Sequence, residues 1–174
     1  MTLALCIGAT AISQKYSTKT GEIIFEASVP SFEEVKAKNT AVSAILNSET
    51  GDFAALVLIK GFRFKVALME EHFNENYIES EKFPKATLKG SILNFSMNSI
   101  QEGTTVFMLQ GDLTLHGESK ELEIPITLIS KNGTLELTTH FILNPEDFNI
   151  EIPNIVRNKV AEKIDVDVHL QLTK

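Results

Sequence analysis

The chain has 174 residues, of which 43% are hydrophobic, and its formal net charge at pH 7 is −7. The length suffices for one domain with a hydrophobic core, and the negative charge argues against nucleic acid and anionic lipid surfaces as partners, because both attract basic proteins. The single cysteine, Cys6, excludes an internal disulfide and a cysteine-based zinc site, and no apolar run after the N-terminus is long enough to span a membrane.

The first 14 residues carry no charged side chain and resemble the second half of a secretory signal peptide. An apolar run at 3–7 precedes small residues with the A-x-A pattern at 9–11. We therefore expect residues 1–14 to be a signal-peptide-like remnant and the domain at 15–174 to be periplasmic or secreted. The alternative is that the first 14 residues form a buried first strand.

The first third of the chain predicts three strands and one short helix. Ser31 can cap a helix over 32–38, because Glu33 and Glu34 would then lie in its first turn, where negative charge is favoured. The other segments have strand character, and a polar turn at 48–52 separates the last two of them. These strands are expected over 22–27, 40–47 and 53–60.

The alternation of apolar residues changes phase at Gly61, which indicates a β-bulge or a sharp bend. A second short helix is expected over 68–80, where Phe73 and Tyr77 are four residues apart and would face the same way. A long strand with a bulge follows at 86–97.

The clearest pattern lies at 104–129, where two long alternating arms flank a polar turn around Gly117. Such a period of two is typical of strands with one face in apolar surroundings. Asn132-Gly133 predicts a second tight hairpin. The rest of the chain predicts two more strands, separated by a turn or a single helical turn at 144–148 and an irregular segment, and these strands are expected over 135–141 and 164–172.

About eight strands with mostly short connections predict an all-β protein with an antiparallel sheet. One polar and one apolar face fit a barrel or a sandwich. A closed barrel also removes the exposed edges that such long apolar strands would otherwise present. We therefore favour a single eight-stranded antiparallel β-barrel with one or two short helices.

No pattern of catalytic or metal-binding residues stands out. Asp165 and Asp167 share a strand face, which is more typical of a solvated edge than of a catalytic pair. No phosphate-binding loop, dinucleotide fingerprint or zinc-protease motif is present. The histidines lack ligand spacing, so surface histidines are a better interpretation than a metal site: His72, His116, His140 and His169.

The apolar strand face is the remaining candidate for function. The chain has 11 phenylalanines and no tryptophan. These side chains either fill the core or line a space that holds an apolar ligand, as the interior of a small barrel can. The predicted lining consists of Phe25, Phe62, Phe64, Leu88, Ile92, Phe107, Leu109, Leu113, Ile126, Leu128, Phe141, Val166 and Val168.

Two stretches resemble the signature of the YceI-like family. They are Phe62-x-Phe64 followed by Asn76-Tyr77-Ile78-Glu79-Ser80-x-x-Phe83-Pro84-x-Ala86-Thr87-Leu88-x-Gly90, and Gly111-Asp112-Leu113-Thr114-Leu115-His116-Gly117-Glu118-Ser119-Lys120 through Ile124-Pro125. The resemblance covers residues 16–172. It implies an extended, lipocalin-like barrel in a secreted or periplasmic protein, and characterised members hold a polyisoprenoid or an isoprenoid quinone in the barrel. The family has a basic or histidine pair after its first-strand phenylalanine, where this chain has Glu26-Ala27, so no head-group residues carry over.

These observations favour a non-catalytic carrier of an isoprenoid-like lipid over two alternatives. One alternative is an envelope structural or stress-response module with a filled core and no ligand. The other is an enzyme acting on lipophilic substrates. The partner expected is an apolar lipid, without nucleic acid or stable membrane insertion, while a homodimer stays open. We expect no metal and no cofactor other than a bound isoprenoid lipid or quinone.

Overall fold

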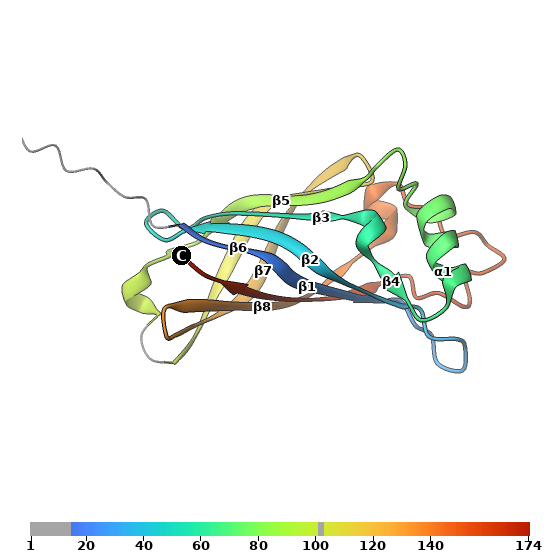
Figure 1. Cartoon of the computed structure of the whole chain (residues 1–174). Helices are drawn as coiled ribbons and strands as arrows, with labels where there is room; N and C mark the ends of the chain where they lie inside the picture. Colours follow the sequence, from blue (N-terminus) through green and yellow to red (C-terminus); the bar gives the residue numbers. More distant parts are fainter. Residues whose placement is uncertain (1–14, 101–102) are drawn as a thin grey trace, which may run out of the picture.

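Eight antiparallel strands close into a barrel (Figure 1). The computed structural model describes residues 15–100 and 103–174, so the expected leader at 1–14 lies outside the described residues. The strands follow one another around the barrel in the order β1-β9-β8-β7-β6-β5-β3-β2, and β2 pairs with β1 to close it. Their bounds are Lys15–Glu26 (β1), Lys36–Asn47 (β2), Asp52–Leu58 (β3), Lys85–Ile92 (β5), Thr104–Leu115 (β6), Glu118–Lys131 (β7), Thr134–Leu143 (β8) and Ile164–Leu172 (β9). The predicted all-β barrel is confirmed.

Two-residue turns join β6 to β7 and β7 to β8. His116 and Gly117 have φ values of 52° and 80°, and Asn132 and Gly133 have φ values of 51° and 78°. Two successive positive φ angles are typical of the type I′ turn, whose twist matches that of the flanking strands. Both predicted hairpins are therefore present, with a tighter first turn than expected, since Glu118 is already paired with Leu115.

The predicted helix over 32–38 is wrong. Ser31 has a φ of 73°, which is incompatible with an N-cap residue in the extended region. The Ser28 hydroxyl instead accepts a hydrogen bond from the Val35 N–H at 3.1 Å, which holds the segment as a loop. Strand β2 begins at Lys36 and pairs with Glu26 of β1, so sheet pairing prevails over the local helix signal.

The second predicted helix is present but shorter. Helix α1 spans Ala67–His72 and continues as a π-helical turn over Phe73–Tyr77. It follows the short strand β4 (Arg63–Phe64), which pairs with β2 outside the barrel order, after a 3₁₀ turn at Ile59–Gly61. Gly61 therefore marks a sharp bend. Within the described ranges, no helix is both long enough and apolar enough to cross a membrane.

The predicted strand over 86–97 is too long, because β5 ends at Ile92. Asn94 has a φ of 54°, and a 3₁₀ turn follows at Met97–Ser99. This segment lies at the end of the barrel opposite α1 (Figure 1). The ring of Phe95 lies 5.9 Å from that of Phe107, centroid to centroid, so the segment packs on the apolar interior at this end.

That end of the barrel is filled with closely packed side chains. Its core contains residues from every barrel strand, contributed by the strand ends that lie away from α1. They include Tyr16, Val42, Leu46, Phe53, Ile92, Phe107, Leu109, Ile124, Ile126, Leu128, Leu135, Leu137, Leu170 and Leu172. The closed end therefore supplies the hydrophobic core on which the rest of the barrel depends.

Candidate ligand-binding cavity

The other end of the barrel encloses a cavity of about 510 Å³. Ligand pockets in proteins typically have volumes of about 300–1,000 Å³. Strands β1, β3, β5, β6, β8 and β9 supply its wall, and α1 and two loops cover its mouth. The residues from the barrel strands are Ile23, Phe25, Val57, Ala86, Leu113, Leu115, Phe141, Leu143, Ile164 and Val166, and the short strand β4 adds Phe64.

On strands β6 and β9, the cavity and the filled core share the same inward face. On β6, Leu113 and Leu115 line the cavity, whereas Phe107 and Leu109 lie in the filled core. On β9, Val166 lines the cavity and Leu170 is in the core. The alternation of each strand therefore places all of these residues inside, and their distance along the barrel axis decides whether they meet a neighbour or an open space.

The predicted lining divides between the two halves. Six of its residues line the cavity: Phe25, Phe62, Phe64, Leu113, Phe141 and Val166. Five are buried in the filled core and do not line the cavity: Ile92, Phe107, Leu109, Ile126 and Leu128. Leu88 and Val168 are partly buried against that core, between the two groups. The cavity therefore lies in the half of the barrel nearest α1, and ligand contact by any of the predicted residues stays a prediction.

Four phenylalanine rings form one side of the cavity. Phe25 on β1 lies 5.3 Å from Phe62, 5.7 Å from Phe64 and 5.3 Å from Phe73, centroid to centroid. Rings at such separations stabilise one another in edge-to-face or tilted arrangements. Phe73 comes from the turn after α1, so this cluster fixes the helical segment against the barrel and gives the cavity a rigid aromatic wall.

Sequence reasoning missed the loops that cover the mouth. The loop between β1 and β2 contributes Phe32 and Val35, and the irregular segment before β9 contributes apolar residues of its own. The latter has no strand or helix period, so no pattern indicated which way its side chains point. Its only signal is an unusual number of apolar residues for a loop, namely Ile150, Ile152, Val156 and Val160.

Polar side chains are few in the lining and come from the mouth. They are Glu33, His72, Tyr77 and Lys159, on the two loops and the helical segment. No group of three or more His, Cys, Asp or Glu residues in the described part of the chain is placed to hold a metal ion. The arrangement suits burial of an apolar molecule, with polar groups confined to where it would meet water.

An ion pair lies where the loop bearing Phe32 leaves the barrel. Lys36 Nζ on β2 lies 3.0 Å from the Glu26 carboxylate on β1. Hydrogen bonding to Lys36 holds the pKa of Glu26 below its usual value of 4.5, and the same hydrogen bond raises the pKa of Lys36. Both side chains are exposed, so the pair orders the two strand ends more than it stabilises the fold.

His116 joins three segments beside the cavity. From the β6–β7 turn, its Nδ1 lies 2.9 Å from the Phe148 carbonyl oxygen and its Nε2 lies 3.1 Å from the Glu79 carboxylate. Its ring centroid is 4.4 Å from that of Phe83. The side chain is only 9% exposed, so the prediction of a surface histidine is wrong here. Since Phe148 lines the cavity, His116 positions part of the wall.

Comparisons with known proteins agree with this architecture. The sequence profile of the YceI-like domain matches residues 14–172. A polyisoprenoid binding domain from Saccharophagus degradans, implicated in plant cell wall breakdown, superimposes with a TM-score of 0.78 at 11% identity, over 91% of this chain and 97% of that one. BcnA of Burkholderia cenocepacia has a TM-score of 0.71 at 14% identity, over 88% and 96%.

A third solved structure, the YCEI protein of Campylobacter jejuni, has a TM-score of 0.63 at 12% identity, over 84% of this chain and 90% of that one. At these identities the three structures share the fold with this chain. Over a stretch of 57 residues, the chain is 39% identical to the membrane protein insertase YidC of Buchnera aphidicola subsp. Schizaphis graminum. It covers 33% of this chain and 10% of that protein, so nothing of that protein's activity carries over.

Proposed function

Because this chain belongs to the YceI-like family, we propose that it binds an isoprenoid-like lipid, a polyisoprenoid or an isoprenoid quinone, and carries it without chemical change. The observation that carries the proposal is the cavity of about 510 Å³ with an almost wholly apolar lining. The solved neighbour described as a polyisoprenoid binding domain supports the choice of ligand class.

The binding free energy would come from burial of the ligand's apolar chain. Each methylene group removed from water contributes about 0.8 kcal/mol. A ligand whose apolar chain fills the cavity therefore needs no set of polar binding residues for its affinity. The polar side chains at the mouth would contact the ligand's head group. Because buried side chains such as Ile92, Leu109 and Leu170 fill the opposite end of the barrel, a chain longer than the cavity would leave through the mouth.

Native mass spectrometry of the full chain tests the proposal. After expression in a quinone-producing host and gentle purification, we expect an apolar species on the order of several hundred daltons to co-purify, and to be released by organic solvent. Extraction and accurate mass would give its class. Protein that carries no such species, and that takes up none when polyprenol or quinone is supplied in detergent, would favour the envelope module without a ligand.

We further propose that the protein acts outside the cytoplasm, as the apolar-then-small pattern at 3–11 suggests. On fractionation of cells that express the whole gene, mature protein should appear in the periplasm or the medium, with its N-terminus within 12–16. N-terminal sequencing identifies the cleavage site. An uncleaved form that stays in the cytoplasm would contradict both the leader and the location.

A further inference from the structure

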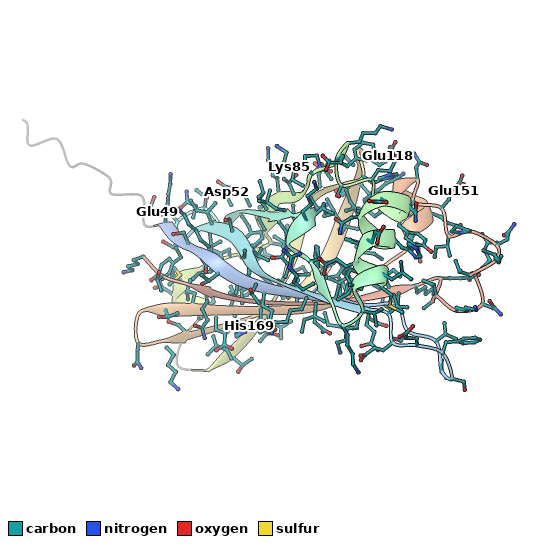
Figure 2. The ribbon with its side chains drawn as sticks, turned by 45° about the vertical axis from the view of Figure 1, so that its right-hand side comes forward. Glu49, Asp52, Lys85, Glu118, Glu151 and His169 are labelled. Carbon is teal, nitrogen blue, oxygen red and sulfur yellow. The ribbon has the colours of Figure 1, made fainter. Side chains whose placement is uncertain are left out.

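Three large apolar side chains are exposed around the mouth of the cavity. Phe32 is 46% exposed, Leu68 is 57% exposed and Ile155 is 85% exposed. They belong to the loop between β1 and β2, to α1 and to the loop before β9. These three segments lie together at one end of the barrel (Figure 1). In Figure 2, Glu151 of the loop before β9 lies at that end, and Glu49 and Asp52 lie at the opposite end.

Each of the three segments that carry these side chains also lines the cavity. Phe32 itself lines the cavity, and the residues that follow Leu68 and Ile155 in the sequence, Met69 and Val156, line it too. The other exposed large apolar residues in the described ranges lie on barrel strands: Ile45, Leu58, Val106 and Ile142. Isolated apolar residues on a protein surface are common, whereas a group that rims a cavity mouth points to an interaction.

We propose that this rim, formed by Phe32, Leu68 and Ile155, docks reversibly on an electrically neutral lipid bilayer, so that the ligand passes between the bilayer and the cavity. The inference rests on the proposed function, because an apolar chain dissolved in a bilayer would otherwise have to cross water. A mouth seated on the bilayer keeps the chain in apolar surroundings throughout.

The charges near the mouth favour a neutral bilayer over an anionic one. The segments 28–35, 67–77 and 149–163 together hold seven acidic and three basic residues, the three basic ones all in 149–163, and the whole chain has a net charge of −7. Anionic lipid head groups attract clusters of lysine and arginine and would repel this surface. With only three side chains to insert, the contact would be brief, unlike that of a long amphipathic helix.

The test uses vesicles of phosphatidylcholine and phosphatidylethanolamine that contain an isoprenoid quinone. The rate of quinone transfer to the full chain is compared for wild type, Leu68→Ser/Ile155→Ser and the control Ile45→Thr/Val106→Thr. Neither Leu68 nor Ile155 lines the cavity, and the control removes exposed apolar residues from strands. We expect the rim variant to transfer quinone at least ten-fold more slowly than wild type, while the control matches wild type and all three load equally from detergent.

Vesicle flotation without quinone measures docking separately from ligand binding. The rim variant should float less with neutral vesicles than the wild type and the control. Equal flotation and equal transfer rates for all three proteins would overturn the inference, as would transfer that requires anionic phosphatidylglycerol. Sedimentation velocity without vesicles tests whether the rim instead binds a second copy of this chain. A wild type that is dimeric, beside a rim variant that is monomeric, would also overturn the inference. Rim-dependent flotation without quinone loading from detergent would instead contradict the proposed function.

Discussion

Leu113→Trp should weaken lipid binding roughly ten-fold or more while the ligand-free protein keeps its stability. Leu113 lies on the cavity wall, so the larger indole can occupy space that the ligand would otherwise fill. Displacing about two methylene groups of the ligand removes about 1.6 kcal/mol of binding free energy, which is about a fifteen-fold loss of affinity. Fluorescence titration with a quinone or polyprenol and a thermal melt of the ligand-free protein measure the two effects.

Leu109→Trp is the matched control, because Leu109 is four residues away on the same face of β6. It is 2% exposed and lies in the filled core, so the added ring has no space to enter. Overpacking of this kind costs about 1–3 kcal/mol of unfolding free energy. Leu113→Trp should therefore lose ligand affinity, whereas Leu109→Trp should lose stability. Equal destabilisation by both would show that the cavity wall is as tightly packed as the core.

Gly90→Ala should be among the most destabilising single-methyl additions in the barrel, at about 2–4 kcal/mol. Gly90 on β5 pairs with Gly111 on β6. A Cβ at Gly90 would lie 2.1 Å from the Gln110 carbonyl oxygen and 2.5 Å from the Gly111 Cα, and both are backbone atoms that can move only with their strand. Urea unfolding of wild type and variant measures the loss.

The control for this change is Gly133→Ala in the β7–β8 turn. Gly133 has a φ of 78°, yet a Cβ there would meet nothing within 4 Å. The control therefore shows only the strain of a left-handed backbone, about 1–2 kcal/mol. Gly90 is not in the left-handed region, so a loss at Gly90→Ala no larger than that at Gly133→Ala would show that β5 and β6 can move apart to accept the methyl group at little cost.

Local patterns in the sequence were sufficient for most of the fold. Each of the strands β6, β7 and β9 has one apolar face, and this produces a period of two in its own sequence. The strand can therefore be recognised without knowledge of its neighbours. The turn at Asn132-Gly133 was equally readable, because few residue pairs tolerate two positive φ angles. Two predictions were wrong where distant contacts prevailed, at the loop before β2 and at the end of β5, since strand pairing and the packing of Phe95 lie beyond any local window.

On strands without a register shift, such as β6, alternation determined which side chains point into the barrel, and tertiary structure decided where the barrel is empty. Leu109 and Leu113 have the same parity, residue type and strand, yet one is packed in the core and the other faces the cavity. The difference depends on what the remaining strands, the segment after β5 and the mouth loops place opposite each residue. A cavity forms where no side chain occupies the space opposite a residue. Because the side chains that could fill this space come from distant parts of the sequence, the alternation of a single strand does not reveal whether it is filled.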